Sequence, residues 1–128
     1  MSENFFFWLG FSILLVHEMD AVRLKEWRIL PVLAQLDDQR GFALFTLAHI
    51  PICTLLLMGL SSEIVADGKG TLMLGLDWFM IVHAGLHFLL RNLPRNEFKT
   101  VFSWLLIGGA AGAGGIDALL YYVTTVHS

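Results

Sequence analysis

The chain contains few charged residues and a single cysteine. Of its 128 residues only 15% are charged, against roughly a quarter in an average soluble domain, whereas 56% are hydrophobic. This composition excludes an ordinary soluble domain and predicts a membrane protein. The lone cysteine, Cys53, excludes an intramolecular disulfide and a multi-cysteine metal site. The sequence also has no run of basic residues, so we expect no nucleic-acid partner.

Hydrophobic residues gather in four long stretches, at residues 5–22, 42–60, 71–90 and 100–126. Each is near or above the roughly 18–20 residues that a helix needs to cross a bilayer. The first stretch has no basic segment before it and ends in His17-Glu18-Met19-Asp20, so we expect it to be a span and not a cleaved signal peptide. The predicted fold is all-α, with residues 1–128 forming one four-helix transmembrane bundle.

The basic residues indicate how these spans are oriented. Seven of the eight lie between the first and second or the third and fourth stretches: Arg23, Lys25, Arg28, Arg40, Arg91, Arg95 and Lys99. Only Lys69 lies on the other side. Because loops rich in lysine and arginine stay in the cytoplasm, we expect both termini to be non-cytoplasmic, in a protein of the inner membrane.

Four histidines lie within the apolar stretches, at His17, His49, His83 and His87. A rise of about 1.5 Å per helical residue places all four at a depth of roughly 5–12 Å on the cytoplasmic side. His83 and His87 also share one helix face, because they are four residues apart. Ionisable side chains are costly in hydrocarbon and are usually kept there for a ligand, a proton path or a partner. The pattern predicts a shared site, although rings near an interface can also simply reach the lipid headgroups.

Carboxylates accompany the first of these histidines. Glu18 and Asp20 flank His17 and are predicted to assist the site, whereas Glu26 is interpreted as an interfacial partner of the basic residues around it. Imidazole combined with carboxylate suits zinc or non-haem iron. A metalloprotease is disfavoured, because the position four residues after His17 is Ala21 and not the histidine of the zincin motif.

The segments His17-Glu18-Met19-Asp20 and Lys25-Glu26-Trp27 resemble motifs of an uncharacterised family of small four-span bacterial membrane proteins. Further elements are similar to the family pattern: His49-Ile50-Pro51, the histidine at 83 or 87, and Asn96-Glu97-Phe98. The resemblance implies the four-span fold, the positions of the site and a bacterial membrane. It implies no activity.

Three functions are compatible with these features, and the sequence leaves open whether the protein is an enzyme. The first is a divalent metal site formed by the four histidines, acting by hydrolysis or oxidation on a lipid-like substrate from the inner leaflet. The second is an electron carrier with a haem held by His49 and either His83 or His87. The third is a non-catalytic subunit, in which the polar layer pairs with a larger membrane complex or a second copy of the chain.

Two features belong to the other half of the bilayer. Asp77 is expected to be hydrated at the interface, whereas Asp117 is expected to face the bundle interior. The glycine and alanine run at 108–115 predicts close contact between helices, with small residues four apart on more than one face, including Gly108/Gly112 and Ala111/Gly115. A broken helix lining a cavity is the alternative interpretation of this run.

Overall fold

The structure, a computed structural model, describes residues 4–65 and 69–126, and the regular elements in this part of the chain are all helical. In order they are α1 (Phe5–Arg23), the short 3-10 helices η1 (Glu26–Arg28) and η2 (Leu33–Gln35), α2 (Asp38–Val65), α3 (Thr71–Leu90) and α4 (Val101–Val126). Each of the four α-helices is long and apolar enough to cross a membrane. The predicted all-α fold with four potential spans is confirmed, and these helices suggest an integral membrane protein.

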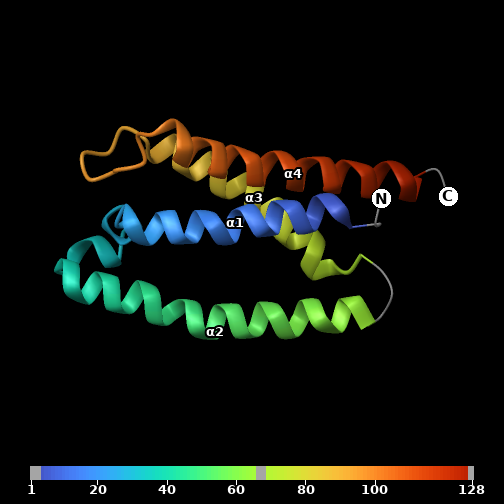
Figure 1. Cartoon of the computed structure of the whole chain (residues 1–128), viewed down its shortest axis with the longest axis horizontal. Coiled ribbons are helices and arrows are strands. Elements are labelled where there is room, and N and C mark those ends of the chain that lie inside the picture. Colours follow the sequence, from blue (N-terminus) through green and yellow to red (C-terminus); the bar gives the residue numbers. More distant parts are fainter. Residues whose placement is uncertain (1–3, 66–68, 127–128) are drawn as a thin grey trace.

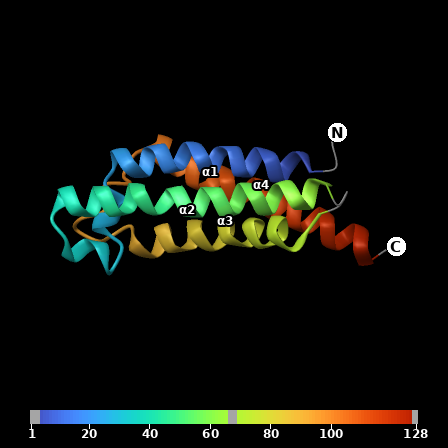
Figure 2. The same ribbon diagram turned by 90° about the horizontal axis from the view of Figure 1, so that it is seen from below.

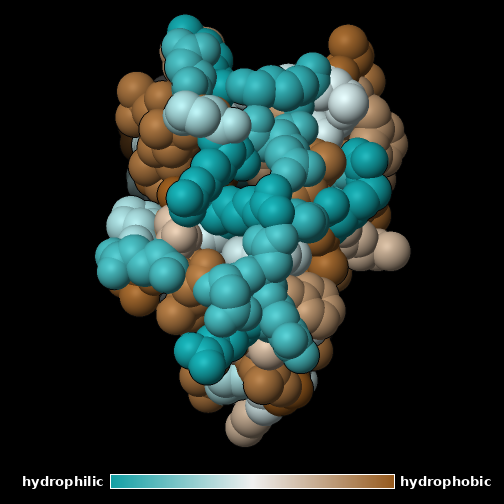
Figure 3. Space-filling view, turned by 90° about the vertical axis from the view of Figure 1, so that its left-hand side faces the viewer, coloured by the Kyte–Doolittle hydropathy of each residue, from teal (hydrophilic) through white to brown (hydrophobic). Residues whose placement is uncertain are grey.

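The four α-helices run along a common axis, and both termini lie at the same end (Figures 1 and 2). The α1–α2 and α3–α4 connections lie together at the opposite end (Figure 1). We call that end, formed by residues 24–37 and 91–100 and the adjoining helix turns, the basic end, because it contains seven of the eight arginines and lysines. Seen from this direction the surface is mainly hydrophilic and is edged by hydrophobic side chains (Figure 3).

Helix α2 extends beyond the predicted stretch 42–60 at both ends. At its start, the Asp37 carboxylate accepts a hydrogen bond of 3.0 Å from the backbone N–H of Arg40. Such a cap satisfies an N–H that has no partner within the helix. The helix therefore begins in a polar segment that hydropathy alone leaves out.

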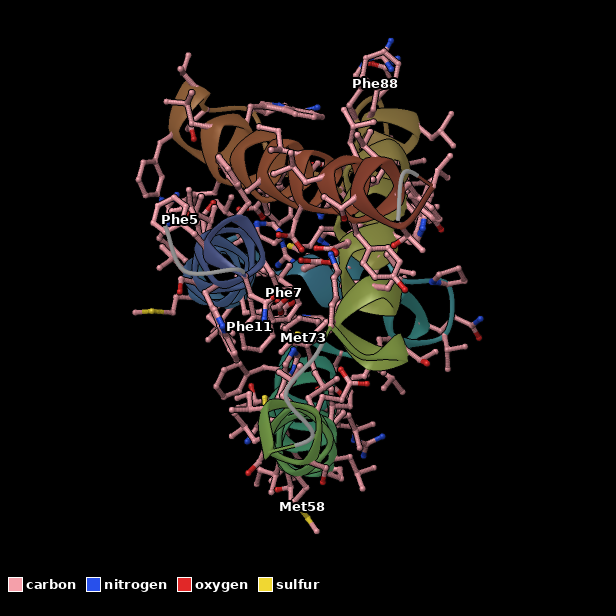
Figure 4. The ribbon with its side chains drawn as sticks, turned by 90° about the vertical axis from the view of Figure 1, so that its right-hand side faces the viewer. Phe5, Phe7, Phe11, Met58, Met73 and Phe88 are labelled. Carbon is pink, nitrogen blue, oxygen red and sulfur yellow. The ribbon has the colours of Figure 1, made fainter. Side chains whose placement is uncertain are left out.

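Helix α4 packs along both α1 and α3, whereas α2 makes few backbone contacts with the other three α-helices. Viewed along the bundle, α2 stands apart, with Phe7, Phe11 and Met73 filling the space towards it and Met58 pointing away (Figure 4). Phe7, Phe11 and Met73 belong to one buried core cluster. The tight part of the bundle is thus formed by α1, α3 and α4.

Helix α4 approaches α3 closely at Gly114. A Cβ atom there would lie 2.9 Å from Met80 Cε and 3.1 Å from the backbone oxygen of Asp77. A Cβ at Gly108 or Gly112 would meet nothing within 4 Å. Small residues in the run do allow close packing, as predicted, but Gly108 and Gly112 do not take part in it. Helix α4 is also continuous through the run, so the broken-helix interpretation is not what the structure shows.

Candidate metal centre

Three imidazoles and one carboxylate converge near the basic end. His17 comes from α1, His83 and His87 from α3, and Glu26 from η1, and one ligand atom of each lies within 4.8 Å of the others. The Nε2 atom of His83 is 3.0 Å from Nε2 of His17 and 3.1 Å from Nε2 of His87. The Glu26 carboxylate lies 3.8 Å from Nε2 of His17 and 3.7 Å from Nε2 of His87. We call these four residues the histidine–glutamate cluster.

The backbone explains how Glu26 reaches the three histidines. Helix α1 is followed by Lys25 in the left-handed conformation, with φ 56° and ψ 50°, which is uncommon for a residue other than glycine. This turn changes the direction of the chain directly after α1. Trp27 is buried and packs against Phe45 of α2, with ring centroids 5.9 Å apart, which anchors η1 beneath the bundle. Glu26 lies between Lys25 and Trp27 and faces the bundle interior.

Three members of the cluster are buried, His83 is half-buried, and the cluster carries unpaired polar atoms. His17 is 0% exposed, His87 3% and Glu26 7%. In the described part of the chain, Nδ1 of both these histidines and one Glu26 oxygen have no hydrogen-bond partner. Burial, reinforced by the nearby Glu18 charge, raises the pKa of Glu26 to about 8. Without a cation beside it, Glu26 is therefore mainly protonated at neutral pH.

Protons alone cannot satisfy the three Nε2 atoms. A neutral imidazole carries a proton on only one nitrogen, so His83 Nε2 can donate to His17 or to His87 but not to both. If His83 Nε2 accepts instead, its single lone pair must accept from both His17 and His87. A central cation would take one lone pair from each ring. In a tetrahedral zinc site with bonds of about 2.0–2.1 Å, ligand atoms lie about 3.3 Å apart. The separations given above run from 3.0 to 3.8 Å, with the two Glu26 distances measured to different carboxylate oxygens, and one ligand atom of each residue lies within 4.8 Å of the others. The donor set is therefore compatible with a metal ion.

The structure places His49 outside the cluster, beside Glu18. Its Nδ1 donates to the Phe45 carbonyl at 2.7 Å, because a carbonyl can only accept, and its Nε2 lies 3.0 Å from a Glu18 oxygen. The second contact must also hold a proton. The pair is thus either imidazolium with carboxylate or imidazole with carboxylic acid, next to the cluster and partly exposed at 31% and 27% of the two side chains.

Asp20 does not reach the cluster either, since both of its oxygens have other partners. Oδ1 accepts from the Arg23 guanidinium at 2.7 and 3.0 Å, and Oδ2 accepts from the Ser103 hydroxyl at 2.6 Å. Asp20 is 5% exposed. Its geometry therefore ties α1 to α4 near the histidines without offering a free ligand atom.

The comparison with protein families agrees with the layout of the chain. A family of unknown function, DUF6713, matches residues 3–124. The chain belongs to this family. No curated protein and no solved structure matches the chain. The resemblance to an uncharacterised family is confirmed, and membership in DUF6713 brings no activity with it.

Glu26 is the member of the site that the sequence analysis missed. The expected pairing with the neighbouring basic residues was wrong: Arg23 pairs with Asp20, and Lys25 and Arg28 pair with Asp38. One signal was present, because Glu26 lies in the Lys25-Glu26-Trp27 motif that carried the resemblance.

A second buried polar group lies towards the termini. The Lys69 ammonium donates to Asp77 at 2.6 Å and also to Asp117. Asp77 is 0% exposed and Asp117 4%. The expectation for Asp117 is confirmed, but that for Asp77 was wrong, because Asp77 is buried in an ion pair and not hydrated at the interface. One Asp77 oxygen has no hydrogen-bond partner in the described structure.

Proposed function

We propose that the protein is an integral membrane protein that binds one divalent metal ion, zinc or iron, between His17, Glu26, His83 and His87. The observation that carries this proposal is the convergence of three imidazole nitrogens and one carboxylate, in which the protons available cannot satisfy both Nε2 contacts of His83. Three neutral nitrogens and one carboxylate form a donor set suited to either metal. The positive-inside rule places the basic end, and with it the site, on the cytoplasmic side.

The Glu18–His49 pair is proposed as the proton donor and acceptor beside this site. It holds at least one transferable proton, as argued from the His49 hydrogen bonds, and it is more exposed than the cluster. Helix α2, which contributes His49, makes few backbone contacts with α1 and α3. A metal ion held here would supply Lewis-acid chemistry, which fits hydrolysis of a lipid-like substrate.

The geometry favours a single ion over a haem. A haem takes two axial ligands, and in the sequence analysis His49 was one of them. In the structure both nitrogens of His49 are engaged by Phe45 and Glu18, and the other three histidines point at a common centre. Their arrangement supports one small cation.

Elemental analysis together with an absorption spectrum tests this proposal. The purified protein, exposed to Zn²⁺ or Fe²⁺ and then dialysed, should retain about one metal per chain and show no haem absorption. Protein that retains no metal with either ion, while remaining folded, would overturn it in favour of a subunit whose histidines serve packing or a proton path. A haem spectrum would overturn it in favour of an electron carrier.

A further inference from the structure

A cavity of about 380 Å³ lies at the basic end, between the last turn of α3 and the first turn of α4. Its lining combines aromatic rings with cationic and amide groups, from Phe88, Arg91, Asn92, Phe98, Lys99 and Trp104. The volume falls within the range of about 300–1,000 Å³ that is typical of small-ligand sites. We call it the α3–α4 pocket; Phe88, at its edge, lies away from the bundle interior (Figure 4).

The two cations of this pocket differ from most others at the same end. Four of the other five pair with carboxylates: Arg23 with Asp20, Lys25 with Asp38, Arg28 with Asp38 and Glu97, and Arg40 with Asp37. The fifth, Arg95, donates to the Ala34 carbonyl. Arg91 donates to the Phe88 carbonyl at 2.6 Å, and Lys99 donates to the Arg91 carbonyl. Within the described residues neither has an acidic partner. The pocket therefore carries uncompensated positive charge that favours an anion.

The position of the pocket indicates what kind of anion it meets. It lies where two potential membrane spans end, which is the level of lipid headgroups. Arginine and lysine bind phosphate oxygens by charge-assisted hydrogen bonds, and basic pockets between spans bind anionic lipid headgroups. The rings of Phe88 and Trp104 supply an apolar wall for the lipid beyond its phosphate.

One residue, Phe98, contacts both this pocket and the histidine–glutamate cluster. Phe98 lines the pocket, and its ring centroid lies 4.6 Å from that of His87 and 5.6 Å from that of His17. Phe98 is 1% exposed, so it is fixed between the two sites. Phe98 therefore links the pocket to the cluster through direct ring contacts.

We propose that the α3–α4 pocket binds the phosphate of an anionic phospholipid and so holds a lipid substrate beside the metal site. That the lipid is a substrate of the metal site rests on the proposed function, whereas headgroup binding itself requires no metal. The pocket recognises the phosphate group, and the membrane lipid is the proposed source of that phosphate.

Binding is tested by titrating detergent-solubilised protein with phosphatidylglycerol, phosphatidylcholine or inorganic phosphate. The Arg91→Gln/Lys99→Gln variant should bind phosphatidylglycerol about tenfold more weakly or worse, because it loses two charge-assisted contacts. Arg40→Gln is the matched control, since it removes a charge at the same end that already pairs with Asp37. This control should bind like the parent protein.

Three results would overturn the proposal: equal binding by all variants, an equal loss in Arg40→Gln, or phosphatidylcholine binding as tightly as phosphatidylglycerol. Inorganic phosphate that binds as tightly as the lipid would overturn the lipid as source. The titration is repeated on chelator-treated protein. Lipid binding retained without metal supports the pocket even if the metal proposal fails, and lipid binding lost with the metal would contradict an independent headgroup site.

Discussion

His17 of α1 and His83 of α3 face each other with their Nε2 atoms 3.0 Å apart. Either histidine alone could be a metal ligand or a buried packing residue. Their short separation favours the ligand role, because His87 and Glu26 converge on the same centre and because protons cannot satisfy the hydrogen bonds of all three rings. The account of the protein depends on this convergence.

Metal affinity should depend on pH through Glu26. Its pKa in the metal-free protein is about 8, and a metal ion binds only the carboxylate. Affinity should therefore rise about tenfold per pH unit below pH 8 and level off above it. The measurement is competition with a chelator of known affinity from pH 6 to pH 9, and Asp20→Asn, which changes no cluster member, should keep the same slope. A flat profile would contradict the assignment of Glu26.

The metal-free protein should show the opposite trend in stability. A pKa raised from 4.5 to about 8 means that folding favours protonated Glu26. This contribution is fully present below pH 4.5 and is lost as the pH rises through about 8. Thermal unfolding in detergent should accordingly show metal stabilising the protein more at pH 8 than at pH 6; equal stabilisation at both would argue against a titrating ligand.

Glu18→Gln should shift the pH at which metal affinity levels off. The Glu18 charge contributes to the raised pKa of Glu26, so its removal should move that point below pH 8. The affinity reached at high pH should change far less than on loss of a ligand. Glu97→Gln, at an acid that pairs with Arg28, is the control and should leave the profile unchanged. If Glu18→Gln abolished binding, Glu18 itself would be a ligand.

The sequence predicts the four helices and much of the histidine site for physical reasons. Hydropathy reports the length of a span, and the rise per residue places His17, His83 and His87 at similar depth. Which helices touch depends on side-chain packing, which these patterns do not report. The sequence could therefore place His49 at the depth of the other histidines but could not show that it lies beside Glu18. Glu26 could not be predicted, since its position follows from the backbone angles of Lys25, and composition does not encode a left-handed turn there.

The other misjudged residues share one cause. The depth of Asp77 was estimated from its place in the stretch, but the sequence does not show that Lys69 reaches it from the α2–α3 connection. Likewise, the glycine run indicated close packing without showing which glycine faces α3. Both depend on the rotation of a helix about its axis, which a nearly uniform apolar sequence leaves undetermined.

Gly114→Ala should destabilise the protein, whereas Gly112→Ala should not. An added methyl at Gly114 would press on Met80 and on the Asp77 backbone, which cannot move without shifting α3. Overpacking of this kind costs about 1–3 kcal/mol. At Gly112 the space is open, and alanine gains up to about 1 kcal/mol in helix propensity. The melting temperatures of the two variants in one detergent check these expectations. Equal changes in melting temperature for Gly114→Ala and Gly112→Ala would contradict the packing of α4 on α3.

Lys69→Met should be among the most destabilising single substitutions. It leaves Asp77 and Asp117 buried without a counter-ion, and breaking a buried ion pair in this way costs about 3–5 kcal/mol. The triple variant Lys69→Met/Asp77→Asn/Asp117→Asn should recover much of the loss, because it removes the unpaired charges as well. The measurement is the thermal unfolding temperature of the two variants compared with that of the parent protein. A Lys69→Met protein as stable as the parent would show that the group is hydrated.

The most direct measurement is the metal content of single-site variants dialysed against a competing chelator. Glu26→Gln and His87→Ala should lose most of the metal, because a site with four protein ligands rarely tolerates the loss of one. His49→Ala should retain about one ion per chain, since His49 pairs with Glu18 outside the cluster. The opposite result, metal lost in His49→Ala and retained in Glu26→Gln, would contradict the central claim and favour a site built from the four histidines.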